Sequence, residues 1–424
     1  MMKTYGLEVP TILASRPEAM LQTDVLGAEA LDGPLKAQWE ALMEECESPL
    51  LFSSHDWTRA WFASFGADKQ LLLITLRSAG RLVGLAPLVL SRLRRRPALA
   101  ARYDFQPEDV GLIKAGGRAR VVPVRQLSVA ANLLSVNMRG GWLIAKEYQQ
   151  AGLLALLEKI AALPDWQMLL LPSVTVTDAA AIAHAAKTMG LRVKWVARLR
   201  TLFSLRVTDW ERYSAQRGRN FRKLCRQAEN RMLAFGAVEL RTATAPDEIA
   251  TLLDEMFALA RQSWKQTGRA DQAVHLPVTS ASTAFVRDLG LRYAAKGRCQ
   301  IVVLRVDGIL RGCMFCVSEG KTLYGMQTYY SSDVAYGSPG RLMMRELIQW
   351  CAAHGIERID LNGNSPLVKT YADTEASYDQ LLLFRPRGYS AVLFGLATFI
   401  GWTTSLLPRL RARGRATEIN EHAS

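Results

Sequence analysis

The sequence predicts an α/β protein built from two copies of one unit, each a mixed sheet flanked by helices. Strand-like runs alternate with segments whose apolar residues recur at helical spacing. In the first half, residues 76–85 (LRSAGRLVGL) align with residues 304–313 (LRVDGILRGC) of the second half, and each stretch predicts a hairpin. The helix and buried strand that follow recur in the same order, which favours a duplicated unit.

The length of the chain limits the number of domains, and its charge limits the kinds of partner. A chain of 424 residues holds about two domains, which we place at 1–194 and 195–387, followed by a tail at 388–424. The net charge of +14 favours anionic partners, namely a nucleotide-like cofactor, an acidic membrane surface or nucleic acid. The chain starts without a secretory apolar segment and its six cysteines lack paired spacing, which predicts a cytoplasmic protein with free thiols.

The elements of the first unit follow an irregular leader. A helix is expected over Pro34–Cys46, and a short aromatic helix, capped by Ser54 or Asp56, ends at Gly66. The remaining elements are a strand pair at 71–76 and 82–90, a helix at 148–162 and a buried strand at 166–171.

The second unit opens with a strongly basic helix. Arg219, Arg222 and Arg226 recur along one side of it, which suits either an anionic ligand or a solvated helix face. The other elements expected before the hairpin are strands at 202–206 and 238–243 and helices at 248–266 and 282–295.

A strand, a loop and a helix then follow in the pattern of a phosphate site. Lys321–Tyr329 predicts a strand, and Gly337-Ser338-Pro339-Gly340 predicts a loop that opens a helix ending near His354. A Gly-rich loop at a helix N-terminus presents backbone N–H groups and a positive dipole end to phosphates. Arg341 adds charge there. A plain turn is the alternative interpretation of this loop.

The segment 389–408 contains no charged residue, and arginines flank it on both sides. Its length is just enough to span a bilayer, but seven Gly, Ser and Thr residues dilute its apolar character. A spanning helix, an interfacial helix attracted to anionic lipid and a buried helix are the three alternatives.

Five blocks in order resemble the GNAT acyltransferase superfamily, specifically its tandem FemAB-like branch of cellulose-biosynthesis-associated acetyltransferases of the CelD/BcsL type. The blocks, which span roughly residues 48 to 385, are Pro49…Phe52…Trp57…Trp61, Arg219-Asn220…Arg222…Arg226, Ser263-Trp264-Lys265, Tyr330…Ser338-Pro339-Gly340…Leu342 and Asp360-Leu361-Asn362-Gly363…Lys369. The sequence departs from the family where Ser331 follows Tyr330, where Val368 precedes Lys369, and where a later Trp is absent.

The resemblance implies two packed GNAT-like domains, an acyl-CoA donor and a cleft between two splayed parallel strands. It places the donor pyrophosphate at Gly337, Ser338, Gly340 and Arg341. Asp360, at the end of a strand, is then the candidate base, with a turn-stabilising contact as its alternative role. The other candidates are Tyr330 as the acid that protonates the thiolate, Lys369 and Arg222 as contacts to anionic substrate groups, and Trp264 and Lys265 as the lining of the acceptor pocket.

Three functions are compatible with these features. The first is an acyltransferase that uses acyl-CoA or acyl carrier protein and acts on an envelope polysaccharide precursor or a lipid-linked acceptor, peripherally at the inner membrane. The second is an aminoacyl-tRNA-dependent transferase, and the third is a non-catalytic scaffold of a membrane synthase. No metal is expected, because the histidines lack ligand spacing, and Cys313 and Cys316 point to opposite faces of a predicted strand.

Overall fold

The computed structural model describes residues 21–47, 49–95, 122–131, 139–262, 279–363 and 365–399. The first half contains β1 (Leu21–Leu26), α1 (Leu35–Glu45), η2 (Leu51–Ser53), α2 (His55–Phe65), β2 (Lys69–Ser78), β3 (Arg81–Arg95), β4 (Val122–Val129), β5 (Leu143–Ile144), α5 (Gln149–Ala162), β6 (Met168–Thr175), α6 (Val176–Thr188) and β7 (Arg192–Arg206). The second half contains α7 (Trp210–Ala215), α8 (Arg219–Leu233), β8 (Val238–Ala243), α9 (Pro246–Gln262), α11 (Ser280–Ala294), β9 (Cys299–Val306), β10 (Ile309–Glu319), β11 (Thr322–Tyr330), η5 (Ser332–Gly337), α12 (Pro339–Ala353), β12 (Arg358–Asp360), α13 (Pro366–Tyr371) and β13 (Thr374–Phe384).

The two halves repeat one strand order, β1-β2-β3-β4-β6 and β8-β9-β10-β11-β12, and each order has a single parallel pair, β4 with β6 and β11 with β12. The two hairpins also share their turn chemistry. Gly80 and Gly308 have φ of 80° and 76°, and Arg77 and Arg305 donate to the carbonyls of these glycines at 2.8 and 3.2 Å. The predicted α/β fold of two similar units is therefore confirmed.

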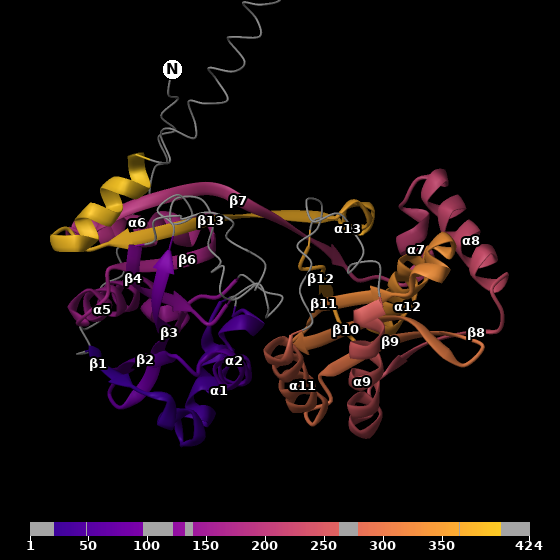
Figure 1. The fold of residues 1–424 in the computed structure, drawn as a ribbon, viewed down its shortest axis with the longest axis horizontal. Helices are drawn as coiled ribbons and strands as arrows, with labels where there is room; N and C mark the ends of the chain where they lie inside the picture. The colour runs from indigo at the N-terminus through magenta and orange to yellow at the C-terminus, as the bar shows by residue number, and fades with distance from the viewer. Residues whose placement is uncertain are drawn as a thin grey trace, which may run out of the picture.

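The two halves exchange their last strands, so that one continuous sheet runs through the molecule (Figure 1). β7 leaves the first half and pairs with β12 of the second, while β13 leaves the second half and pairs with β6 of the first. The strands also pair with each other along their length. The proposed boundary between residues 194 and 195 lies inside β7, and the division into two domains stays a prediction.

Three apolar clusters pack against this sheet. The largest joins both halves, because α1, α2, α5, α6, α9 and α11 all contribute side chains to it. The second lies under α8 and α12 in the second half. The third is small and lies where residues 388–399, helical in the structure, cover β4, β6 and β13. Among the described residues, no helix is both long enough and apolar enough to cross a membrane.

Candidate active site

The parallel strands β11 and β12 pair only briefly. Their shared register runs from Thr322 opposite Arg358 to Tyr324 opposite Asp360, after which β11 continues to Tyr330 and β12 ends. The chain then turns at Asn362, which has a left-handed φ of 47°. Because η5 and the turn both leave from the carboxyl ends of parallel strands, the loop to α12 and the segment to α13 meet at one edge of the sheet, where ligands bind in open α/β sheets.

The predicted phosphate loop lies at this edge and opens α12. Ser338 has a left-handed φ of 55°, makes no side-chain capping bond, and is followed by Pro339 at the first helical turn. Non-glycine residues in this region are strained, and such strain concentrates at functional sites. The N-terminus of α12 therefore lies at the loop for which the sequence predicted phosphate binding.

The two glycines of the loop are also required by packing. A Cβ at Gly337 would lie 2.7 Å from Cε of Met232 on α8, and a Cβ at Gly340 would lie 2.9 Å from Cδ2 of Leu367 on α13. A side chain at either position must displace a neighbouring helix or its side chain. Substitution of these glycines consequently tests packing as well as binding.

Arg341 carries positive charge at the start of α12. Its Nη1 is buried and has no hydrogen-bond partner among the described residues. The guanidinium lies beside the Cys225 thiol of α8, whose pKa is raised by burial even though Arg341 acts to lower it. A buried guanidinium nitrogen without a partner is costly unless a ligand or water binds it.

Asp360 forms a buried ion pair with a residue of the first half. Arg139 Nη1 donates to Oδ2 of Asp360 at 2.7 Å and Nη2 donates to Oδ1 at 3.3 Å, while the backbone N–H of Asn362 donates to Oδ1 at 2.9 Å. Burial lowers the pKa of Arg139, but the Asp360 carboxylate outweighs this effect and the net pKa is raised. The turn-stabilising contact that the sequence offered as an alternative is present, and the carboxylate also joins the two halves.

An aromatic cage surrounds the Arg139 guanidinium. Its carbon lies 4.5 Å from the ring centre of Phe52, 5.9 Å from that of Tyr324 and 5.8 Å from that of Tyr378. These rings come from η2, β11 and β13, so both halves contribute to the cage. Sequence reasoning missed Arg139, since its partner lies 221 residues away.

Tyr330 lies at the carboxyl end of β11 and is half-buried. Burial raises the pKa of its phenol above the ordinary value of about 10. The hydroxyl therefore stays protonated through neutral pH, as a general acid must. Its position at the end of the longer parallel strand is compatible with the role that the resemblance implies.

Two other candidates make contacts within the protein. Arg222 Nη1 donates to the carbonyl of Arg217 at 2.8 Å and also reaches the last carbonyls of α7. Lys369 is exposed, and its Nζ lies 5.6 Å from the ring centre of Phe203 on β7. Their substrate-binding roles stay predictions. Trp264 and Lys265 lie outside the described residues.

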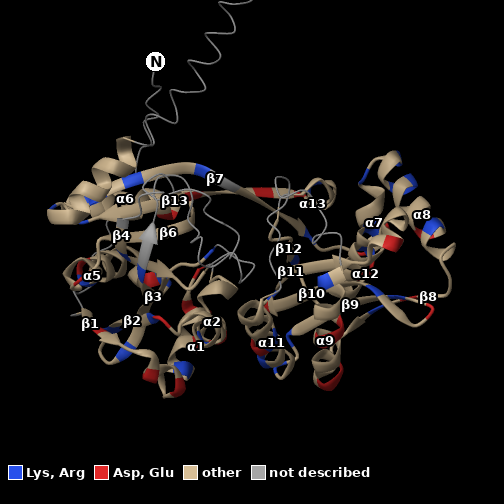
Figure 2. Cartoon of the chain, viewed as in Figure 1, with Lys and Arg blue, Asp and Glu red and all other residues tan. Residues whose placement is uncertain are grey.

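The basic helix α8 flanks this edge of the sheet, and Figure 2 shows Lys and Arg along it. Arg231 lies 4.6 Å from the ring centre of the exposed Tyr336 in η5, and Arg345 of α12 pairs with Glu229 at 2.9 Å. Arg231 thus adds a positive charge beside the loop, which suits an anionic donor, whereas the charge of Arg345 is paired. Among the described residues, no group of three His, Cys, Asp or Glu could hold a metal ion.

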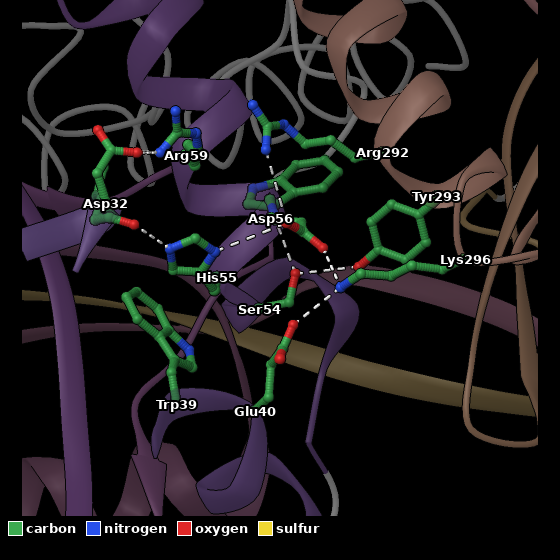
Figure 3. A network of polar contacts seen from close by, with 12 residues as sticks. Asp32, Trp39, Glu40, Ser54, His55, Asp56, Arg59, Arg292, Tyr293 and Lys296 are labelled. Atoms are coloured by element: carbon green, nitrogen blue, oxygen red, sulfur yellow. Dashed lines mark hydrogen bonds and ion pairs between the residues drawn. The ribbon is translucent and has the colours of Figure 1, made fainter. Parts of the chain in front are cut away.

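A second buried network joins α2 to α11 across the two halves (Figure 3). Asp56 accepts a hydrogen bond from Lys296 at 2.5 Å, and Arg292 Nη1 lies 4.0 Å from the carboxylate. Ser54 caps α2 and lies 3.2 Å from the hydroxyl of Tyr293. Burial alone raises the pKa of Asp56, but the hydrogen bonds from His55 and Lys296 outweigh burial and lower it.

We expect Asp56→Asn to destabilise the protein by about 1.5–3 kcal/mol at neutral pH, since it removes charge-assisted hydrogen bonds. Because the folded pKa is depressed, the contribution of Asp56 is complete above its unfolded pKa of about 4 and is lost as the pH falls below it. The deficit measured by urea unfolding should therefore shrink toward acid pH. Asp254→Asn, which removes an exposed partner of Arg287, is the control and should change stability by less than about 1 kcal/mol. An equal deficit at pH 7 and pH 3 would contradict the assignment.

Comparison with known sequences identifies the class of the second half. Residues 219–371, from the start of α8 to the end of α13, match the acetyltransferase (GNAT) domain family. This segment contains the diverging parallel strands, the loop at 337–340 and Arg341. It is a GNAT acetyltransferase domain, and the protein is a GNAT-type transferase. A search of curated proteins found no match.

Three solved structures resemble this chain at low sequence identity. A crystal structure of FemX is 11% identical with a TM-score of 0.55, and the match covers 82% of this chain and 95% of that one. The C-terminal domain of a putative lysylphosphatidylglycerol synthetase from Agrobacterium fabrum is 12% identical with a TM-score of 0.48, covering 88% and 96%. L-PGS from Bacillus licheniformis is 13% identical with a TM-score of 0.45, covering 87% and 97%. Only the FemX likeness is close enough to show a common fold, and none of the three identifies a substrate.

Proposed function

We propose that the protein transfers an acyl group from acyl-CoA, or from acyl carrier protein, to an amine or hydroxyl of an envelope polysaccharide precursor or a lipid-linked acceptor. The observation that carries this proposal is the parting of β11 and β12 beside the N-terminus of α12, within the segment that matches the acetyltransferase domain. The CelD/BcsL-type branch, suggested by the sequence blocks, belongs to the same proposal.

The geometry supports the following division of roles. The donor pyrophosphate lies against Gly337, Ser338, Gly340 and the guanidinium of Arg341, and the pantetheine arm follows β11. The acceptor nitrogen or oxygen attacks the thioester carbonyl carbon, the carbon–sulfur bond breaks, and the thiolate takes a proton from Tyr330. The acceptor loses its proton to solvent or to a base. Asp360 stays a candidate base, although its bonds to Arg139 favour a positioning role.

The acceptor side of the proposal rests on fewer contacts. Lys369 is exposed on α13, and Trp264 and Lys265 complete the proposed acceptor contacts. We propose that the protein works in the cytoplasm at the inner face of the membrane, supported by the net charge of +14 and the uncharged segment 389–408. This location brings the donor cleft to an acceptor that is carried by lipid.

A thioester-consumption assay tests the proposal. Acetyl-CoA and longer acyl-CoAs are supplied with amine and hydroxyl acceptors, and release of free thiol is measured together with the mass of the acylated product. Transfer from aminoacyl-tRNA but not from acyl-CoA would favour the FemAB-type alternative, which the basic α8 and the FemX-like fold support. Binding of CoA without turnover of any donor would favour a non-catalytic scaffold.

Tyr330→Phe should lower kcat by roughly 100-fold or more and leave the Kd for CoA unchanged, because it removes only the proton donor. In the unaltered protein, kcat should fall as the pH rises through the raised pKa of Tyr330, and the variant should lack this limb. Tyr336→Phe is the matched control, since that phenol is exposed on the neighbouring η5. A variant with unchanged kcat and the same alkaline limb would remove Tyr330 from the mechanism.

A further inference from the structure

The C-terminal helical segment 388–399 is fixed to the outer face of the first-half sheet. Leu393 and Ala397 are buried against Met168 and Leu170 of β6 and Phe384 of β13. The segment is thus seated by one apolar face, and its position relative to the sheet is defined by packing.

Hydrogen bonds reinforce this seating. Ser390 Oγ donates to the carbonyl of Gln167 at 2.5 Å, and the hydroxyl of Tyr389 donates to the carbonyl of Pro123 at 3.0 Å. At the far end, Lys194 Nζ of β7 donates to the carbonyl of Ala397 at 2.6 Å. The segment therefore has a defined face toward the sheet and a defined face toward its surroundings.

The outward face of this segment is apolar. Tyr389, Val392, Leu396 and Phe399 are 40, 56, 36 and 59% exposed, respectively. They are spaced three, four and three residues apart, which places them along one side of a helix. No residue in 388–399 carries a charge. We call these four residues the apolar stripe. Contiguous exposed apolar surface of this kind marks an interaction site.

Basic residues lie before the helix, beside it on β7 and, in the sequence, after it. Arg387 is exposed immediately before the segment, whereas Arg192 of β7, whose guanidinium lies 5.5 Å from the ring centre of Phe394, contacts the sheet-facing side of the helix. Figure 2 shows Lys and Arg on the part of β7 beside this helix. The 25 residues from 400 to 424 begin where the stripe ends and contain arginines at 409, 411, 413 and 415. An apolar face flanked by cations has the chemistry that anionic lipid headgroups and acyl chains accept together.

We propose that the apolar stripe is a membrane-docking face that lies in the boundary between headgroups and acyl chains of an anionic bilayer. The charge favours lipid over a second copy of this chain, because like-charged surfaces that each carry bordering arginines repel. The docking deepens the membrane location proposed above, and its purpose, access to a lipid-carried acceptor, rests on the proposed function. It does not depend on the acyl-transfer reaction.

The test is sedimentation of the full-length protein with vesicles of phosphatidylcholine alone and with vesicles containing roughly one-third phosphatidylglycerol. We expect binding to the anionic vesicles at least about tenfold tighter than to the neutral ones, and weaker but measurable binding in high salt. The double variant Val392→Asp/Phe399→Asp should lose about tenfold or more of the partition coefficient. Equal binding of the variant and the unaltered protein would overturn the proposal.

The matched control is Val176→Asp/Ile309→Asp, which adds the same charge at two apolar positions of α6 and β10 that are 46 and 55% exposed. It should bind vesicles like the unaltered protein, and equal loss in both double variants would overturn the assignment to the stripe. Circular dichroism and thermal unfolding verify that each variant is folded. Acyl transfer to a water-soluble acceptor should be the same in all three proteins, so failure of docking and failure of the proposed enzyme function are read separately.

Two further outcomes identify other occupants of the stripe. Light scattering could show a dimer that Val392→Asp/Phe399→Asp converts to a monomer. If vesicles also bind neither form, the stripe is a contact between copies and the lipid proposal is overturned.

Truncation after Phe399 tests the remaining chain. If the truncated protein still binds vesicles, the stripe is supported. If the truncated protein loses all binding while the double variant keeps it, the membrane contact lies in residues 400–424 and the proposal is overturned.

Discussion

Arg139→Met should be among the most destabilising single substitutions in the chain, costing about 3–5 kcal/mol in the free energy of unfolding. The substitution leaves the Asp360 carboxylate buried without its cation, at the point where β11 and β12 part. Asp360→Asn should cost a similar amount, because it removes the carboxylate that compensates the charge of the Arg139 guanidinium inside its aromatic cage. Urea unfolding followed by tryptophan fluorescence measures both.

The two substitutions should not be additive. In the double variant Arg139→Met/Asp360→Asn neither charge is buried alone, so the total cost should be smaller than the sum of the single costs. Arg81→Met is the control, since Arg81 pairs with Glu45 and Glu147 while about half of its side chain is exposed, and such pairs contribute roughly 0–1 kcal/mol. Additive costs, or a control as damaging as Arg139→Met, would show that the pair does not join the halves.

The same variants connect stability to function. Because Arg139 comes from the first half and holds the end of β12 in the second, it sets where the parallel strands separate. Folded Asp360→Asn protein should therefore bind CoA more weakly, even though neither partner of the pair is assigned to a phosphate. If Asp360 were instead a free base, its substitution would lower kcat and leave stability unchanged.

The elements that the sequence predicted well are those with strong local patterns. Both hairpins carry a glycine that needs a left-handed φ, and α5 and α12 carry apolar residues at helical spacing, so each segment specifies its own structure. The loop at 337–340 was recognisable for the same reason, because glycine and proline restrict the backbone locally.

The features that the sequence did not predict depend on distant partners. β7 was expected only from 202 to 206, since its first part is rich in basic residues and gains its strand form by pairing with β13. β13 was missed because its amino end is polar and it crosses into the first half. The contacts of Arg222 with the carbonyls of Ser214, Ala215 and Arg217 could not be read from its charge pattern, and its substrate-binding role stays a prediction. Local sequence shows which residue is charged but not which carbonyl, ring or carboxylate lies opposite it.

Arg341→Gln should weaken CoA binding by roughly 10–100-fold, which corresponds to the loss of about 1.5–3 kcal/mol from hydrogen bonds to a charged group. The expectation rests on the buried Nη1 that has no partner among the described residues and on its place beside the strained Ser338 at the start of α12. The slope of CoA affinity against salt should also become shallower, because one cation near the phosphates is removed. Calorimetry with CoA measures both effects.

The matched control for Arg341 lies one turn later on the same helix. Arg345 pairs with Glu229 at 2.9 and 3.2 Å, so Arg345→Gln removes an arginine from α12 that already has a protein partner. It should leave the Kd for CoA within about threefold, well under the tenfold that 1.4 kcal/mol represents. Acetyl-pantetheine, which lacks the pyrophosphate, provides a second comparison. Arg341→Gln should reduce kcat/KM for acetyl-CoA and spare acetyl-pantetheine. Equal losses with both donors would mean that Arg341 supports the fold of the cleft and does not bind phosphate.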